Sequence, residues 1–137
     1  MGIVRLPQPF AGVTPLALVD KAPRPRTRGT IVGFGEDGLG HIAIKEMGTV
    51  RLKRCPNAIR SVGIVRGQLS TSICWHPKRH GNDTCSGDSG GPLLVDNAVA
   101  GVTVGGYGRT ASCPGILSWD TSVARVRDWI DSASSAP

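Results

Sequence analysis

The chain has 137 residues, a formal net charge of +6 and 19 glycines, and only 4% of its residues are aromatic. The length suits one domain with a buried core, and the composition disfavours a helical bundle and favours a turn-rich β fold. No apolar run approaches the length of a membrane span, so we expect no membrane partner.

The predicted strands are short apolar stretches separated by Gly, Pro and Asn/Asp turns, a pattern typical of a barrel or sandwich. In chain order they are residues 2–6, 15–19, 29–35, 41–46, 49–53, 61–65, 92–95, 98–104 and 116–119. Between the second and third of these, the two prolines of PRPRTR (23–28) exclude a helix and favour an extended connector.

One helix is predicted over residues 120–132, because four apolar residues fall on a single helical face there. These residues are Val123, Val126, Trp129 and Ile130. Asp120 or Thr121 could cap the free amides at the start of the helix. We expect the apolar face to pack onto the strands, and residues 134–137 to form a frayed tail.

The positive charge is concentrated in the middle of the chain. Residues 21–80 contain 12 Lys/Arg and 3 Asp/Glu, whereas residues 81–137 contain 3 and 6. The densest basic positions are Arg24, Arg26, Arg28, Arg51, Lys53 and Arg54. They could form a polyanion-binding face, but a solvated basic surface is favoured, because no aromatic residues interleave with them for base stacking. We therefore expect no nucleic-acid partner.

The four cysteines are Cys55, Cys74, Cys85 and Cys113, at long spacings without any CxxC. An even number in this pattern favours two structural disulfides and an oxidising compartment. A zinc site is the alternative, because His76 and His80 lie between Cys74 and Cys85. It is less favoured, since the intervening segment is basic and Cys85 is close to a candidate nucleophile. No metal or cofactor is expected.

That nucleophile is Ser89, in the stretch GDSGGP (87–92). Glycines on both sides permit the backbone angles of a tight loop and leave room for a substrate carbonyl. In such a loop the amides of Gly87 and Ser89 can converge on one point and form an oxyanion hole. The alternative is a glycine-rich β-turn with an incidental serine.

Beyond this chemistry, CSGDSGGPLL (85–94) closely resembles the active-serine motif of trypsin-like, chymotrypsin-fold serine proteases. Further segments resemble that family in the same order along the chain: MGIVRLPQPF (1–10), GTIVGFG (29–35), TSICWHP (71–77), AGVTVGG (100–106) and TSVARVRDWI (121–130). The resemblance implies an all-β fold, the C-terminal six-stranded Greek-key barrel of a two-barrel protease, over residues 1–133. A helix over about 121–132 would close it.

The resemblance also implies catalytic roles. Ser89 would be the nucleophile of a serine endopeptidase, with the Gly87 and Ser89 amides as oxyanion donors. Asp88 would support the oxyanion loop by pairing with an N-terminal amine created by zymogen cleavage. Without that amine we expect an unpaired carboxylate and a relaxed loop. The implied disulfides are Cys55–Cys74 and Cys85–Cys113.

Substrate recognition follows from the same resemblance. Asp83 would lie at the base of the specificity pocket and pair with an Arg or Lys of a protein or peptide substrate. The backbone of Val104, Gly105 and Gly106 would pair with the substrate as an added strand, and Gly106 would keep the pocket open. For Asp83, the alternative is an ordinary residue in a polar turn.

The other two members of a Ser-His-Asp triad are not recognisable in the sequence. The family's histidine lies in an Ala-Ala-His-Cys context, which is absent, and none of His41, His76 or His80 fits the role. The family's aspartate would fall directly before Met1. We therefore expect a truncated protease half that lacks its N-terminal barrel and is inactive alone. The alternative is a non-catalytic remnant or partner-binding half-domain. Disulfides and family indicate a secreted or periplasmic protein, although no signal peptide is recognisable.

Overall fold

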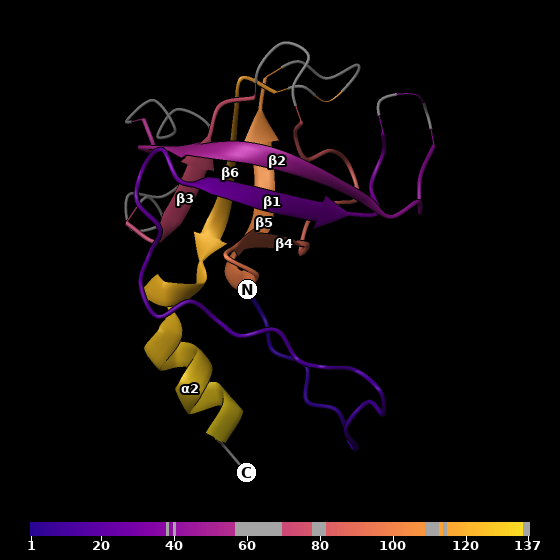
Figure 1. Cartoon of the computed structure of the whole chain (residues 1–137), viewed down its shortest axis with the longest axis vertical. Helices are drawn as coiled ribbons and strands as arrows, with labels where there is room; N and C mark the ends of the chain where they lie inside the picture. The colour runs from indigo at the N-terminus through magenta and orange to yellow at the C-terminus, as the bar shows by residue number, and fades with distance from the viewer. Residues whose placement is uncertain are drawn as a thin grey trace.

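Antiparallel strands close into a barrel in the computed structural model, which describes residues 1–37, 39, 41–56, 70–77, 82–108, 113 and 115–135 (Figure 1). Within these residues the strands are β1 (Arg28–Gly33), β2 (Glu46–Lys53), β3 (Ser72–Trp75), β4 (Pro92–Val95), β5 (Ala98–Tyr107) and β6 (Leu117–Ser122). Their order around the barrel is β1-β2-β3-β6-β5-β4, and β4 pairs back with β1. The expected six-stranded barrel is therefore confirmed.

The barrel core is made by alternate residues of the strands. In β2, for example, Val50 and Leu52 are buried, whereas Arg51 and Lys53 between and after them are exposed. Side chains that alternate in this way line the inside of the barrel, where they form one apolar cluster. Its buried members are Ile31, Val50, Leu52, Ile73, Trp75, Leu93, Val95 and Ala100.

Most predicted strands coincide with observed ones. The stretches 29–35, 49–53, 92–95, 98–104 and 116–119 fall on β1, β2, β4, β5 and β6. β3 was not predicted as a strand, and residues 61–65 lie outside the described part. The stretches 2–6 and 15–19 form no strand, although Leu18 makes a single bridge to Val99. Of residues 41–46, only Glu46 is in a strand.

The segment before β1 lies outside the barrel and is largely exposed, which explains why its apolar stretches form no strands. Val4 is 84% exposed and Phe10 is 71% exposed. Figure 1 shows this segment, in indigo, running past the end of the barrel beside α2. Strand formation needs a partner edge, and within the described part the backbone of this segment bonds to the barrel only near its end: Ala17 and Val19 bond to Val99, and Arg26 and Thr27 bond to Leu52.

The predicted C-terminal helix is confirmed, but its start and its packing differ from the prediction. Residues 120–122 continue β6, because they pair with both β3 and β5, so Asp120 and Thr121 are not caps. A 3-10 helix η2 (Val123–Arg125) follows, and then α2 (Arg127–Ser135), which extends into the expected tail. Of the apolar face only Val123 is buried, and Trp129 is 44% exposed. Figure 1 shows α2 projecting away from the strands.

Two disulfides fasten the ends of these strands. Cys55, just after β2, is bonded to Cys74 in β3, and Cys85 is bonded to Cys113, which precedes β6. These are the pairings that the family resemblance implies. No helix within the described residues has the length and apolar character needed to cross a bilayer.

Candidate active site

The active-serine loop, residues 85–91, connects the Cys85–Cys113 disulfide to β4. Gly87 and Gly90 have φ angles of 97° and 88°, in the left-handed region that favours glycine. The amides of Asp88 and Gly91 donate to the carbonyls of Cys85 and Asp88, at 3.1 and 2.9 Å, so the loop consists of two tight turns. The glycines of the motif are therefore needed for the backbone shape of the loop.

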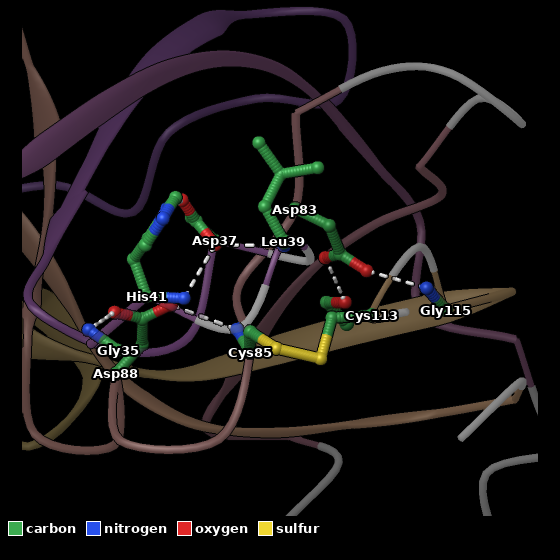
Figure 2. Close-up of a disulfide and its surroundings, with 10 residues drawn as sticks. Gly35, Asp37, Leu39, His41, Asp83, Cys85, Asp88, Cys113 and Gly115 are labelled. Atoms are coloured by element: carbon green, nitrogen blue, oxygen red, sulfur yellow. Dashed lines mark hydrogen bonds and ion pairs between the residues drawn. A yellow bond between two sulfur atoms is a disulfide. The ribbon is translucent and has the colours of Figure 1, made fainter. Parts of the chain in front are cut away.

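The Asp88 carboxylate fixes this loop against the end of β1. One oxygen accepts a hydrogen bond from the Gly35 amide and the other from the Cys85 amide, both at 2.8 Å (Figure 2). The expectation of an unpaired carboxylate is thus wrong. Bonds from backbone amides to a carboxylate are among the stronger hydrogen bonds in proteins.

Glycines at positions 33 and 35 make room for this carboxylate. A methyl group on Gly33 would overlap Asp88 Oδ1, and one on Gly35 would come within 2.7 Å of the same atom. The stretch GTIVGFG was singled out in the sequence without a role for these glycines. In the structure Gly33 and Gly35 have such a role, since the Asp88 carboxylate packs directly against their backbone.

Ser89 is exposed at the tip of the loop, next to backbone amides that have no partner among the described residues. Within the described part of the chain, neither the Gly87 amide nor the Ser89 amide donates a hydrogen bond. The neighbouring Gly90 amide, by contrast, donates to the Thr103 carbonyl, and the Thr103 amide donates to Gly91, both at 2.9 Å. Thr103, which sequence reasoning did not identify, therefore anchors the loop to β5 and leaves two amides free.

β5 offers a backbone edge directly beside this anchor. β4 pairs with β5 only as far as Val102, whereas β6 continues to pair with Gly105, Gly106 and Tyr107. Val104 lies in a bulge and is 49% exposed. Among the described residues, the stretch Val104–Gly106 thus has a strand on one side only, as a site for an added peptide strand requires.

Asp83 is held near the other end of the Cys85–Cys113 disulfide. One carboxylate oxygen accepts from the Gly115 amide at 2.6 Å, and the other from the Ser118 hydroxyl at 2.5 Å (Figure 2). The carboxylate is only partly buried, and two of its acceptor positions are used. Ser118, a buried residue of β6, was not identified from the sequence, because nothing local to it signals its partner 35 residues away.

A cavity of about 220 Å³ lies between these two aspartates and the ends of β1 and β2. It is lined by five acidic residues: Glu36, Asp37, Glu46, Asp83 and Asp88. No lysine or arginine of the described part lines it. Such a cavity attracts a cationic group and repels an anionic one.

The histidines do not complete a triad within the described residues. His41 Nδ1 lies 2.6 Å from Asp37 Oδ2, and this hydrogen bond lowers the pKa of the Asp37 carboxyl from its ordinary value. No hydrogen bond joins His41 or His76 to Ser89 in the part of the chain that the structure describes, and His80 lies outside that part. The zinc alternative is also wrong, because Cys74 and Cys85 are both in disulfides and are not free thiolates.

Asp120 is a further ionisable group that sequence reasoning placed wrongly. Asp120 lies in β6, where it pairs with Ile73 of β3 on one side and with Thr103 of β5 on the other, and it is 0% exposed. Within the described residues, neither of its oxygens has a hydrogen-bond partner. Burial raises the pKa of Asp120 to about 7, and the neighbouring Thr103 side chain opposes this shift only in part.

Comparison with known proteins agrees with this arrangement. Residues 1–130 match the family model described as Trypsin. The chain is 42% identical to Trypsin 5G1 of Aedes aegypti over 86 residues, which cover 62% of this chain and 30% of that protein. It is 32% identical to human Kallikrein-8 over 127 residues, 86% of this chain and 45% of that protein. The chain thus spans less than half the length of these two relatives.

A solved structure shows the same fold. Neuropsin, described as a serine protease expressed in the limbic system of mouse brain, superposes with a TM-score of 0.69 at 24% identity. The match covers 90% of this chain and 55% of the neuropsin chain.

Proposed function

The chain belongs to the trypsin family of serine proteases, and on that premise we propose that it forms the serine-bearing half of a serine endopeptidase. The observation that carries the proposal is the active-serine loop. It exposes Ser89, leaves the Gly87 and Ser89 amides without a partner among the described residues, and adjoins the backbone edge at Val104–Gly106 that no described strand covers. These are the three parts that acyl transfer from a peptide needs on the side of the nucleophile.

In the proposed reaction the substrate strand pairs with Val104–Gly106, and its scissile carbonyl carbon lies against Ser89. The Ser89 hydroxyl oxygen bonds to that carbon while its proton passes to a general base. The negative charge that develops on the carbonyl oxygen is bound by the Gly87 and Ser89 amides. The base then protonates the leaving amine, and water hydrolyses the acyl-enzyme by the same steps.

We propose that the base and its orienting carboxylate come from an N-terminal barrel of the kind that the family resemblance implies. Two observations support this. No described histidine bonds to Ser89, and α2 together with the segment before β1 exposes apolar side chains such as Phe10 and Trp129. A surface of this kind favours association with a partner. The alternative, a non-catalytic half-domain, is supported by the same observation that no described histidine bonds to Ser89.

A fluorophosphonate probe tests the catalytic proposal, since it reacts covalently with an activated serine. We expect the 137-residue chain alone to label slowly and incompletely. A version joined to a family N-terminal barrel should label stoichiometrically, and Ser89→Ala should abolish that labelling. Complete labelling of the chain alone would show that the base lies within these residues. No labelling in either form, with the fold intact, would favour the non-catalytic alternative.

We further propose that Asp83 selects substrates with Arg or Lys at the cleaved bond. Its support is the acidic cavity, in which Asp83 keeps a partly exposed carboxylate that can pair with a guanidinium or ammonium group. The two disulfides also support an oxidising compartment, and on that ground we propose that the protein is secreted or periplasmic.

Replacing Asp83 with serine should weaken cation recognition by about 2–3 kcal/mol, or roughly 100-fold, because a partly buried charge pair is lost. Benzamidinium, a planar aromatic cation, is a suitable probe, and its affinity can be measured by calorimetry on the chain alone. Asp96→Ser, an exposed turn position, is the matched control and should leave affinity unchanged. A lowered Tm with unchanged affinity would instead show that Asp83 only holds Gly115 and Ser118.

A further inference from the structure

A second charged region lies at the opposite end of β1 and β2 from the acidic cavity. It consists of six exposed cations, here called the basic cluster: Arg24, Arg26, Arg28, Arg51, Lys53 and Arg54. Two segments far apart in the sequence form it, because Arg28 lies opposite Arg51 in the β1–β2 register. The Arg26 amide also bonds to the Leu52 carbonyl at 2.7 Å, which places the connector before β1 against the end of β2.

Within the described residues the basic cluster forms no ion pair. All ten Asp and Glu residues of the sequence lie in the described part of the chain, and none of them forms an ion pair with any of the six cations. Instead, two arginines, Arg28 and Arg51, occupy directly opposite positions on neighbouring strands, and like charges in such positions destabilise a sheet. An external anion that bound here would relieve this repulsion.

The backbone of the connector is also unusual. Arg26 has a φ of 79°, in the left-handed region that non-glycine residues rarely adopt and that costs on the order of 1–3 kcal/mol. The conformation is held by the Arg26–Leu52 bond, and the Arg26 carbonyl accepts from Arg51 Nε at 3.4 Å. The two segments of the cluster are therefore joined through Arg26 as well as through the strand register.

We propose that the basic cluster binds a sulfated polysaccharide. Five of its six cations are arginines, whose planar forks match the oxygens of a sulfate group. Nucleic acid is less well matched, because no aromatic residue occurs in either segment of the cluster, and Trp75, which pairs with Leu52, is 1% exposed. Bases would have no exposed ring on which to stack.

The site is separate from the candidate active site. β1 runs from Arg28 in the cluster to Gly33 beside the acidic cavity, a distance of roughly 17 Å at the usual rise of a strand. A polysaccharide on the cluster would thus leave Ser89 accessible. This inference does not depend on the proposed protease activity and can be tested without it.

Heparin is the probe for the test, with binding to the 137-residue chain measured by calorimetry at several salt concentrations. We expect salt-sensitive binding that the double variant Arg28→Ser/Arg51→Ser weakens about tenfold or more. The control Lys45→Ser/Arg125→Ser removes the same charge from two exposed positions outside the cluster and should bind heparin nearly as well as the native chain. The variant also loses the bond from Arg51 Nε to the Arg26 carbonyl, so its Tm is measured alongside to show that it stays folded.

Two outcomes would overturn the proposal. Equal weakening in the variant and in the control would show that heparin responds to overall charge and not to this cluster. Binding is also measured for desulfated heparin, which lacks the sulfate groups, and for a single-stranded oligonucleotide of similar length. If the oligonucleotide bound through Arg28 and Arg51 as tightly as heparin did, the ligand would be a nucleic acid and not a sulfated polysaccharide.

Discussion

Gly33→Ala is expected to lower the free energy of unfolding by about 4 kcal/mol and to displace the active-serine loop. The added methyl group would overlap Asp88 Oδ1 and come within 2.6 Å of Asp88 Cγ. Asp88 would then have to move, and both its bonds to the Gly35 and Cys85 amides would break. Each bond to a charged acceptor is worth about 1.5–3 kcal/mol, so the loss is a large part of a typical stability of about 5–15 kcal/mol.

Urea denaturation of the native chain and the variant measures this effect. Gly105→Ala is the matched control, because it also changes a strand glycine, and its nearest neighbour, Trp119 Cζ2, would be 3.9 Å from the new methyl group. A double-mutant cycle with Asp88→Ala gives the sharper test. Gly33→Ala should cost much less in that background, where the carboxylate is already gone. Equal costs in both backgrounds would contradict the contact between position 33 and Asp88.

The second large effect concerns pH and Asp120. Burial raises the pKa of this carboxyl to about 7 in the folded chain, from an ordinary value of 3.8. Below about pH 4 the group is protonated in both the folded and unfolded states and costs nothing. Between pH 4 and 7 the unfolded chain releases the proton while the folded chain retains it, so stability falls as pH rises. Above pH 7 the full cost, about 4 kcal/mol, is reached.

Asp120→Asn keeps the shape of the side chain but cannot ionise. The difference in free energy of unfolding, variant minus native chain, should increase by about 4 kcal/mol between pH 4 and pH 8, because only the native chain is destabilised as the pH rises. Taking the difference at each pH cancels the other titrating groups. Asp96→Asn makes the same substitution at an exposed position in the β4–β5 turn and is the control for the exchange itself. If the free energies of unfolding of Asp120→Asn and the native chain differed by the same amount at every pH, the burial of an ionisable carboxyl at this position would be refuted.

Local patterns predicted the parts of the molecule that depend on neighbours in the sequence. The motif around Ser89 places two glycines where the loop needs left-handed backbone angles, and the alternation around Val50 and Leu52 marks β2. The resemblance to a family added what no spacing rule could, namely the partners of Cys74 and Cys85. The local patterns and the family resemblance together predicted the barrel.

The errors share one physical cause, which is pairing between distant segments. Residues 120–122 fit a helical pattern, but strands β3 and β5 on both sides offer them backbone hydrogen bonds, and β6 continues through them. Residues 2–6 are mostly apolar, yet they pair with no strand of the described chain. The contact between Gly33 and Asp88 joins positions 55 residues apart in the sequence. A local sequence pattern cannot predict a contact over such a separation.

The position of β6 has a consequence for the synthesis of the protein. β6 is the last strand along the chain, but it lies between β3 and β5, and β3 has four residue pairs with it against two with β2. On a ribosome that adds about 5–20 residues per second, β3 would emerge roughly 2–9 s before its main partner. During that interval one backbone edge of β3 has no strand to pair with. A nascent chain of this barrel is therefore open to wrong strand pairing at this edge until β6 has been synthesised.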